Sequence, residues 1–568
     1  MKIEKVHIKN FRSIKDLEFR FPESGIMVLV GANNAGKSNI VRAINNILGE
    51  SWWGKNIDEV DFYMRIRRNT IEIEIEFDNG KRVEFNSKDG WPKYFDENGN
   101  LIKSNKGSMK EDFPCTYLSA ERGVSQTLSF NKWSLMGKVA QSFNKLIKEK
   151  NKAEELENKF MEVMNILEQV EEFRRFKEDF VNFFEEMQAD TPYKLKVDFK
   201  PFSPLNYFKT INILANDNTL GDKYDIDIEE LGEGNRNLMI LSLLRSYAKN
   251  FKKQAQGLLI IEEPEIYMHP QARKHLLKVF KEIVKNSDIQ IMITTHSSTF
   301  IETEHFENIA LVYKTKETGT KIRQVFKEEL ADFSNKTGAG GKSTTDNIVE
   351  FYSITSDEKL KEAFFAKKVI LVEGDTEEIC LPVLLGKVGI DINQKGISII
   401  GVEGKTQIPK YWRLFYKFNI PMLIIFDNDI SKPEKEKNNG IIANCFKLSI
   451  EDIEKCEIFK VVNGGFDQKL IVFNNNFETA SEEDFKRYCD ENELDNRFDE
   501  FKQEAEKLGL RKAQKHRYIL RKISEQYVNY RPKYLEEIKK FIEFDEQPTD
   551  NQTVSKNVGD FDDNSIPF

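Results

Sequence analysis

One glycine-rich segment near the N-terminus restricts the fold of this chain more than any other feature. Residues 31–39 read GANNAGKSN, match the pattern G-x-x-x-x-G-K-[S/T] and follow the apolar run GIMVLV. A buried strand, a tight turn and a helix are therefore expected in succession. In such a turn the backbone N–H groups bind phosphate, Lys37 reaches the outer phosphates and Ser38 binds Mg²⁺. The segment predicts a nucleotide-binding α/β domain.

Two later segments supply the other groups that nucleotide hydrolysis requires. The apolar run in GLLIIEEPEIYMHP ends at Glu262 and Glu263, and IQIMITTHSSTF places His296 after a further apolar run. Phosphoryl transfer needs a Mg²⁺ ligand and a group that orients the attacking water. We assign these tasks to Glu262 and Glu263, and the sensing of the γ-phosphate to His296. With the phosphate loop, these residues predict an ATPase.

Length and composition set broader limits. A chain of 568 residues is too long for one hydrophobic core, so two or three domains are expected. The apolar runs are about half as long as a bilayer crossing, and the N-terminus reads as a strand, so a cytoplasmic protein without a membrane partner is expected. The five cysteines form no CxxC pair, which predicts reduced thiols. The net charge of −9 argues against nucleic acid as a general partner, but says little about one local groove.

Several patterns predict the organisation of the first domain. The period-two alternation of the opening residues indicates edge strands that lead into a central strand, and NTIEIEIEFDNGKRVEFN indicates a hairpin. Residues 134–187 show helical spacing of apolar residues, which predicts two long helices in a hairpin. Their apolar stripe fits either a core or a dimer seam. Residues 334–345, SNKTGAGGKSTT, are expected to form a linker or mobile loop, because they lack the strand and the spacing of a phosphate loop.

A second α/β pattern follows this segment. Strands are expected at 368–372, 396–400 and 421–426, and helices at 375–388 and 406–418. This alternation implies a second, small parallel sheet. From about Glu451 the chain is expected to be helical and charged, and after about Glu546 to be an unstructured acidic tail.

Acidic residues follow two of the expected parallel strands. LVEGDTEE places Glu373 at a strand end and Glu377 one turn into the next helix, and MLIIFDND places Asp427 and Asp429 beyond the other strand. Open α/β sheets build their sites at these carboxyl ends. Four oxygen ligands from three backbone elements suit one or two Mg²⁺ or Mn²⁺ ions, and two such ions can stabilise both reacting oxygens of a phosphodiester. The glycine turn GVEGK, residues 401–405, lies between the two acidic pairs.

The segments NNAGKSN and EEPE, together with the early NFRS, resemble those of the ABC-type ATPases of the RecF, SMC and overcoming-lysogenisation-defect (OLD) group. The resemblance implies a set of nucleotide-binding residues: Arg12, Asn34, Gly36, Lys37, Ser38, Asn39, Glu262 and His296. In that group a glycine-rich turn, here ELGEGNRN, completes the ATP site of a partner subunit. A homodimer or a higher homo-oligomer is therefore implied. Gly232 stands where many relatives carry serine. This chain therefore lacks, at that position, the hydroxyl that would contact the γ-phosphate bound by the partner subunit.

The acids in EGxxE and DxD resemble those of the Toprim fold of topoisomerases, primases and OLD nucleases. An ABC-type ATPase followed by Toprim resembles the OLD-family nucleases, including the nuclease subunit of the Gabija phage-defence system. The implied fold is α/β: a P-loop ATPase with a helical-hairpin insertion, then a Toprim parallel sheet and a helical C-terminal region. The expected boundaries are 1–133 and 191–333 for the ATPase, 134–190 for the insertion that could dimerise, 334–345 for the linker, 362–545 for Toprim and its helical extension, and 546–568 for the tail.

Family members add late residues to this site. The resemblance implies Glu478 as a further metal ligand, and Lys512, or alternatively Lys515, as the lysine that stabilises the transition state. The implied activity is ATP-regulated, divalent-metal-dependent DNA cleavage in anti-phage defence, with a defence-operon partner. ATP and Mg²⁺ are the implied cofactors, with Mn²⁺ or Ca²⁺ as alternatives at the nuclease site. The alternatives are a RecF- or SMC-like DNA clamp without nuclease activity, and a primase- or topoisomerase-like enzyme, for which no motif with a nucleophilic tyrosine is seen.

The last residues, GDFDDNSIPF, resemble the acidic C-terminal peptide of bacterial single-stranded-DNA-binding proteins. In those proteins an apolar pocket with a basic rim receives the peptide. The resemblance implies that Pro567 and Phe568 either occupy such pockets on repair proteins or fold back on a basic groove of this chain. The alternative is a solvated acidic tail.

Overall fold

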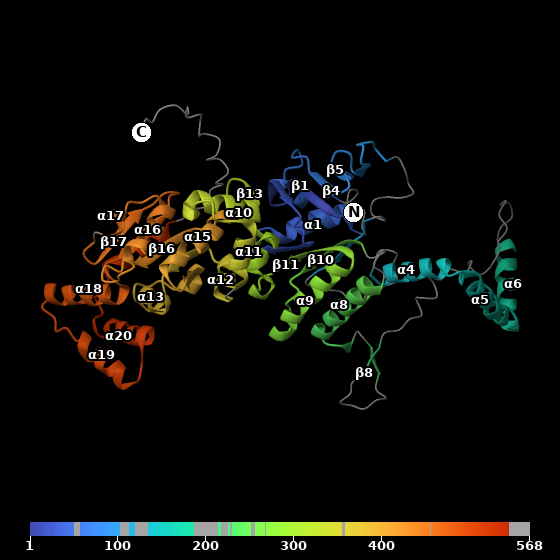
Figure 1. Ribbon diagram of the computed structural model, residues 1–568. Coiled ribbons are helices and arrows are strands. Elements are labelled where there is room, and N and C mark those ends of the chain that lie inside the picture. Colours follow the sequence, from blue (N-terminus) through green and yellow to red (C-terminus); the bar gives the residue numbers. More distant parts are fainter. Residues whose placement is uncertain are drawn as a thin grey trace, which may run out of the picture.

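The computed structural model describes most of the chain. The described residues are 1–49, 57–102, 113–119, 135–186, 214–216, 225–227, 230–250, 256–266, 268–354, 358–454 and 456–544. The expected acidic tail, residues 546–568, lies outside them. Figure 1 shows a helical insertion (α4 to α6) at one end of the molecule, the sheet of the first domain in the middle and the second sheet domain at the other end.

An 11-stranded sheet forms the first domain. Its strands are β1 (Ile3–Phe11), β2 (Ile14–Arg20), β3 (Ile26–Val30), β4 (Glu72–Phe77), β5 (Arg82–Asn86), β6 (Pro92–Phe95), β7 (Cys115–Leu118), β10 (Gln256–Glu262), β11 (Asp288–Thr294), β12 (Ile309–Thr315) and β13 (Gly319–Arg323). The order is β6-β5-β4-β1-β2-β13-β12-β3-β11-β10-β7, with parallel pairing from β12 to β7 and antiparallel pairing elsewhere. The opening strands, expected at an edge, are therefore interior, because β13 and β4 flank them. The β4–β5 hairpin is confirmed.

Helices cover both faces of the parallel part of this sheet. In β3, Met27 and Leu29 face the cluster that contains α1 (Lys37–Leu48), while Val28 and Val30 face the cluster that contains α9 (Pro270–Asn286). The all-apolar composition of β3 follows from this burial on two sides. Beside α9 lies α8 (Glu233–Asn250).

The helical insertion consists of α4 (Leu135–Glu149), α5 (Ala153–Glu168) and α6 (Glu171–Glu186). Two helices were expected here, and that prediction was wrong. A left-handed residue, Asn151 with φ of 53°, ends the first helix, and a break before Glu171 separates the other two. Met161, Ile166 and Phe176 are more than half exposed, so apolar side chains lie on the surface of the insertion.

The connection between the domains is α10 (Lys327–Ser334), a π-helical turn (Asn335–Ala339), α11 (Thr345–Ile354) and α12 (Glu358–Glu362). The prediction of a linker or mobile loop is thus wrong for residues 335–339. Thr337 is 1% exposed and bonds to Arg413, so the turn is packed against the second domain. Its glycines permit the turn, because Gly338 and Gly340 have positive φ.

The second domain contains a five-stranded sheet. Its strands are β14 (Lys368–Val372), β15 (Ile397–Gly401), β16 (Met422–Asp427), β17 (Phe459–Asn463) and β18 (Lys469–Phe473), in the order β15-β14-β16-β18-β17. Its helices include α13 (Asp375–Lys387), α14 (Ile392–Lys395), α15 (Ile408–Lys417), α16 (Lys435–Phe446) and α17 (Ile450–Glu454). The three expected strands and two expected helices are confirmed. The expectation of only helices after Glu451 is wrong, since β17 and β18 form an antiparallel hairpin.

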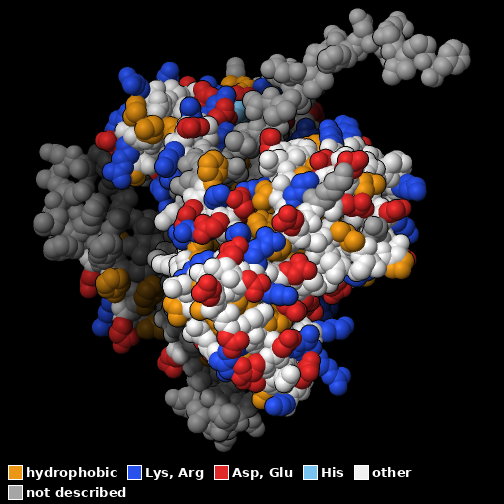
Figure 2. Space-filling model, turned by 90° about the vertical axis from the view of Figure 1, so that its left-hand side faces the viewer, with side chains coloured by type: hydrophobic (Ala, Val, Ile, Leu, Met, Phe, Trp, Pro, Cys, Tyr) orange, Lys and Arg blue, Asp and Glu red, His pale blue; other side chains and the backbone are white. Residues whose placement is uncertain are grey.

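Four helices complete the described part of the chain: α18 (Phe477–Glu491), α19 (Phe498–Lys507), α20 (Lys512–Gln526) and α21 (Lys533–Glu543). Figure 2 shows this end of the molecule, where Lys and Arg side chains alternate with Asp and Glu over the surface. Within the described ranges, no helix has both the length and the apolar composition that a bilayer crossing requires.

Candidate functional site

The phosphate loop lies between β3 and α1, as its pattern predicts. Gly31 and Gly36 have φ of 144° and 112°, which residues with side chains rarely adopt. A Cβ atom at Gly31 would lie 2.1 Å from the carbonyl oxygen of Val312, and one at Gly36 would lie 2.1 Å from Oγ1 of Thr320. Both positions therefore require glycine. The first turn of α1 begins directly after the glycine turn and carries no side-chain cap, which suits phosphate binding by its backbone N–H groups.

Lys37 is buried at the start of α1. Its Nζ lies 2.8 Å from the carbonyl oxygen of Gly31 and 3.0 Å from Nε2 of His296. Burial lowers the pKa of Lys37 to about 8, and burial together with the Lys37 charge lowers the pKa of His296. The structure thus brings the predicted γ-phosphate sensor into contact with the phosphate-binding lysine.

The predicted Mg²⁺ ligand Glu262 and the predicted catalytic Glu263 lie at the end of β10. The parallel pairing of β10 with β11, and of β11 with β3, places Glu262 and Glu263 at the same sheet edge as the loop. Glu262 is 7% exposed and accepts a 2.6 Å hydrogen bond from the hydroxyl of Tyr117. Glu263 has φ of 44°, a left-handed conformation that is uncommon outside glycine and is often found at functional sites.

Glu265 belongs to this site, although the sequence analysis did not single it out. Its Oε1 accepts 2.8 Å hydrogen bonds from Oγ1 of Thr295 and from the backbone N–H of His296. It therefore fixes the loop that carries His296. Its position as the last acid of the EEPE segment was the one indication of this role in the sequence.

Four other predicted nucleotide-site residues lie around the loop. Asn34 is exposed with φ of 63°, and Ser38 is half-buried in the first turn of α1. Asn39 donates a 2.7 Å hydrogen bond to Oγ of Ser13. The guanidinium of Arg12 instead donates to the buried Asp61, at 2.8 and 3.0 Å. The structure therefore shows Arg12 paired with a carboxylate, and its role at the nucleotide stays a prediction.

The glycine-rich turn of the predicted signature leads into α8. Gly232 is exposed, and a Cβ atom there would meet no heavy atom within 4 Å. A lack of room for a side chain therefore does not explain why this position is glycine.

A second group of carboxylates lies at one edge of the second sheet. Parallel pairing aligns the ends of β14, β16 and β18, with Val372 opposite Ile425 and Asp427 opposite Phe473. Glu373 follows β14, and its Oε2 accepts a 3.1 Å hydrogen bond from the backbone N–H of Asp427. Glu377, in the first turn of α13, is 3% exposed. The structure thus brings together the acids that the sequence predicted from two separate segments.

The surroundings of these carboxylates disfavour their ionised forms. Burial raises the pKa values of Glu373, Glu377 and Asp427, that of Glu377 to about 8. Repulsion among the carboxylates, including Glu478, adds to the shifts of Glu377 and Asp427. A cation bound among these carboxylates would remove this penalty.

Asp429 is held by two lysines that the sequence analysis missed. Nζ of Lys405 lies 2.8 Å from Oδ2 of Asp429, and also donates to the carbonyl oxygen of Asp427 (2.8 Å) and to Oδ1 of Asn439 (3.0 Å). Lys405 is 2% exposed. Nζ of Lys432, on the surface, lies 2.7 Å from Oδ1 of Asp429. The sequence indicated Lys405 only as the last residue of the segment GVEGK, which follows β15 at the same sheet edge.

Glu478 lies at the start of α18, directly after β18. Its Oε1 accepts a 2.8 Å hydrogen bond from Oγ1 of Thr376 on α13, so it faces the EGxxE segment, and its role as a metal ligand stays a prediction. The ring of the buried His516 packs against Phe477 at 5.6 Å, which places α20 beside this residue.

The two candidate lysines of α20 lie differently from the expectation. Lys512 is exposed with φ of 42°, and Lys515 pairs with Glu506 at 3.2 Å. Among the described residues, Lys405 and Lys432 are the lysines in contact with the predicted acidic ligands. The transition-state role of Lys512 remains a prediction.

A divalent cation fits the chemistry of this acid group. Oδ1 of Asp427 is buried without a hydrogen-bond partner in the described structure, and its neighbours are carboxylates with raised pKa values. Hard oxygen ligands of this kind suit Mg²⁺ or Mn²⁺. Within the described ranges, however, no three His, Cys, Asp or Glu side chains converge closely enough to bind one ion as they stand.

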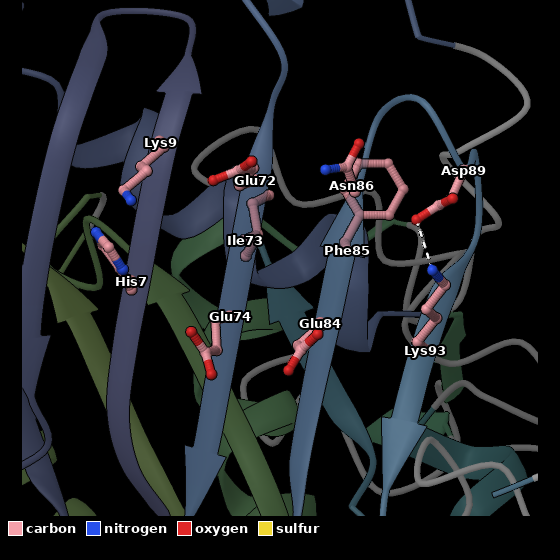
Figure 3. Close-up of a pocket in the computed structure, with 10 residues that line it drawn as sticks. All are labelled: His7, Lys9, Glu72, Ile73, Glu74, Glu84, Phe85, Asn86, Asp89 and Lys93. Carbon is pink, nitrogen blue, oxygen red and sulfur yellow. Dashed lines mark ion pairs between the residues drawn. The ribbon is translucent and has the colours of Figure 1, made fainter. Parts of the chain in front are cut away.

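A separate hollow of about 320 Å³ lies on the antiparallel sheet and is unrelated to either site (Figure 3). Glu74 lies opposite both His7 and Glu84, and Lys93 pairs with Asp89 at 2.8 Å. Charges of both signs line this hollow, and no predicted site residue does.

The fold and the two sites define a class of protein: a P-loop ATPase joined to a Toprim domain. The model of the family "AAA ATPase domain" matches residues 1–113 and 86–301, and that of "Overcoming lysogenization defect protein-like, TOPRIM domain" matches residues 364–429. The chain belongs to the AAA ATPase family, whose model spans more than half of it, and the Toprim match together with the relatives below supports an OLD-family ATPase–Toprim nuclease.

Three relatives illustrate the extent of this similarity. The "OLD nuclease" of Thermus scotoductus is 24% identical over 488 residues, which cover 78% of this chain and 88% of that protein. The "Old nuclease" of Escherichia phage P2 is 24% identical over 568 residues, which cover 90% and 91%. The "Endonuclease GajA" of Bacillus cereus (strain HuB5-5) is 30% identical over 237 residues, which cover 38% and 33%.

Proposed function

We propose that this protein is an ATP-regulated, divalent-metal-dependent DNA endonuclease of anti-phage defence. One observation carries the proposal: Glu373, Glu377 and Asp427 meet at one sheet edge with raised pKa values, in the domain that the OLD-like Toprim family matches. Such a group is costly in a folded protein unless it binds a cation.

In this proposal, bound Mg²⁺ or Mn²⁺ would activate water and stabilise the charge that develops on the phosphodiester. Glu373, Glu377 and Asp427 would hold the metal, with Glu478 as a further ligand from α18. Lys405 fixes Asp429, because three acceptors hold its ammonium group. Lys432 lies on the rim of the site, 64% exposed, where it can meet a DNA phosphate.

At the ATP site the loop and Lys37 would bind the phosphates, while Ser38 and Glu262 would hold Mg²⁺. Glu263 would orient the attacking water, and His296, in contact with Lys37, would sense the γ-phosphate. The glycine-rich turn before α8 would complete this site in a second subunit, so we propose a homodimer or a higher assembly.

Regulation by ATP is supported by contacts of the connecting π-helical turn with the second domain. Arg413 on α15 donates from Nε to Oγ1 of Thr337 (2.8 Å) and from Nη2 to its carbonyl oxygen. In the same turn, a Cβ atom at Gly338 would lie 3.3 Å from the side chain of Asn444 on α16. The helix α16 also carries Asn439, which binds Lys405 beside the acids. A shift of the ATPase can therefore reach the nuclease site through α16.

This coupling can be tested with Arg413→Ala, compared with Lys437→Ala on the exposed side of α16 as the matched control. We expect Arg413→Ala to retain ATP hydrolysis but to bring the ratio of cleavage rates with and without ATP close to one. The control should keep the wild-type ratio. A wild-type ratio in Arg413→Ala would contradict this route.

A second candidate function is an ATP-dependent DNA clamp without nuclease activity. Supercoiled plasmid incubated with the protein in EDTA, Mg²⁺, Mn²⁺ or Ca²⁺, with and without ATP, distinguishes the two. Metal-dependent nicking or linearisation supports the endonuclease, whereas ATP-dependent DNA binding with no cleavage in any metal supports the clamp.

A further inference from the structure

A hollow of about 460 Å³ lies where α19 meets α20, away from the acid group. Six residues line it: Leu508, Leu510, Gln514, Arg517, Tyr518 and Arg521. Leu508 is 62% exposed, although it is a large apolar residue beside a folded core. The hollow therefore combines an apolar wall with two arginines.

The hollow occupies the outward face of α20. Gln514, Arg517, Tyr518 and Arg521 follow the i, i+3, i+4, i+7 spacing of one helix face, whereas the opposite face, around Leu520, is buried. Residues 511–522 contain six Lys or Arg and no acidic residue. Arg521 and Lys522 each lie 5.5 Å from the ring centre of Tyr518. In the described structure Arg517 forms no ion pair, so its charge is available to a ligand.

The chemistry of this hollow favours an acidic peptide with apolar side chains. Arginines recognise carboxylates with paired hydrogen bonds, and an aromatic and aliphatic wall binds Phe, Ile or Pro side chains. A nucleic-acid backbone would use the arginines but would leave Leu508 and Leu510 without a partner.

We propose that this hollow binds the acidic segment 560–568 of the same chain, DFDDNSIPF. The segment alternates three aspartates with Phe561, Ile566, Pro567 and Phe568, which complements both the rim and the wall. Residues 545–568 contain six acidic residues and one lysine, so long-range attraction to α20 has the correct sign.

The length of the chain permits this contact. The 15 residues from 545 to 559 separate the last described residue, Phe544, from the segment. Extended, they span about 50 Å, which exceeds the diameter of about 41 Å expected for a spherical domain of about 180 residues, whose radius of gyration is roughly 16 Å. The linker is therefore longer than the domain is wide.

The consequence rests on the proposed nuclease function. The buried face of α20 carries His516, which packs against Phe477 beside Glu478, so the same helix borders the acid group on one face and carries the hollow on the other. The bound segment would occupy Arg517 and Arg521, which DNA phosphates would otherwise contact. The segment thus restrains DNA binding until it is displaced.

Docking is tested in the full-length protein by replacing Phe568 with the photo-crosslinker p-benzoyl-phenylalanine. After irradiation, mass spectrometry should map the crosslink to residues 508–521. The charge reversal Arg517→Glu/Arg521→Glu should reduce it at least tenfold, while Lys486→Glu/Arg487→Glu on α18, two exposed cations outside the hollow, should leave it unchanged. Crosslinks that map elsewhere, or that survive reversal in the hollow, overturn the proposal. This readout requires no nuclease activity, so its failure is distinct from failure of the proposed function.

DNA binding in EDTA tests the restraint. If the segment occupies the hollow nine-tenths of the time, Ile566→Ala/Phe568→Ala should tighten DNA binding about tenfold. Unchanged DNA affinity in that variant overturns the restraint. If Arg517→Glu/Arg521→Glu weakens DNA binding but leaves the crosslink intact, the hollow is a DNA groove and the peptide proposal is wrong.

Discussion

Replacement of Lys405 by methionine tests how the acid group is held together. The ammonium group of Lys405 is buried and contacts three acceptors, one of them the carboxylate of Asp429. Methionine keeps much of the side-chain volume but removes the charge and all three hydrogen bonds. Because the Asp429 carboxylate, 6% exposed, then keeps only the surface lysine Lys432, we expect a loss of about 3–5 kcal/mol, the usual cost of breaking a buried pair.

The matched control is Lys432→Met, which removes a cation from the same carboxylate at a surface position. An ion pair of this exposure contributes about 0–1 kcal/mol. For a domain of 150–250 residues, 1 kcal/mol corresponds to about 2–4 °C in Tm, so the expected decreases are about 6–20 °C for Lys405→Met and at most about 4 °C for the control.

The assay is thermal unfolding of both variants and the wild type in EDTA, followed by fluorescence and by calorimetry. EDTA is required because a bound cation would replace part of the lost charge. A decrease for Lys405→Met no larger than that of Lys432→Met would refute the reasoning that Lys405 is the main support of Asp429.

Two further predictions concern nucleotide and protons. Lys37→Ala should abolish the binding of a fluorescent ATP analogue, whereas Glu263→Gln should bind it normally and hydrolyse ATP on the order of 10²-fold more slowly; equal turnover in Glu263→Gln and wild type would exclude its catalytic role. The folded-state pKa of Glu377 is raised to about 8. The metal-free folded state therefore binds more protons than the unfolded state from about pH 4.5 to 8. Because of this difference, the contribution of Glu377 to stability falls as pH rises through that window. Thermal unfolding in EDTA should show this loss of stability, and saturating Mg²⁺ should reduce the loss. A metal-free Tm of the wild type that rises from pH 6 to pH 8, relative to that of Glu377→Gln, would contradict the raised pKa.

Much of the architecture could be predicted because strong local patterns agree with the tertiary structure. The apolar runs before Glu373 and Asp427 are buried on both faces, so their length and their acidic ends mark them as central parallel strands. The phosphate loop is equally local, since Gly31 and Gly36 adopt backbone conformations that require glycine.

Other features depend on contacts between distant segments. Lys405 is buried because Asp429 and Asn439, 24 and 34 residues later, surround it, and no local pattern shows this. The hairpin of β17 and β18 was missed because a charged, helix-like context flanks two strands of only five residues each. The linker prediction was wrong because composition shows no sign of Arg413, 76 residues beyond its partner Thr337.

The most direct test of the central claim is plasmid cleavage by variants of the acid group. Glu373→Ala and Asp427→Ala are compared with the wild type and with Glu483→Ala, an exposed acid on α18, in Mg²⁺ and in Mn²⁺, after circular dichroism and ATP binding have shown that each variant folds. The account predicts that both acid-group variants lose nicking of supercoiled DNA by on the order of 10²-fold or more, while Glu483→Ala cleaves at the wild-type rate. Undiminished nicking by Glu373→Ala and Asp427→Ala would contradict the assignment of the nuclease site to these carboxylates.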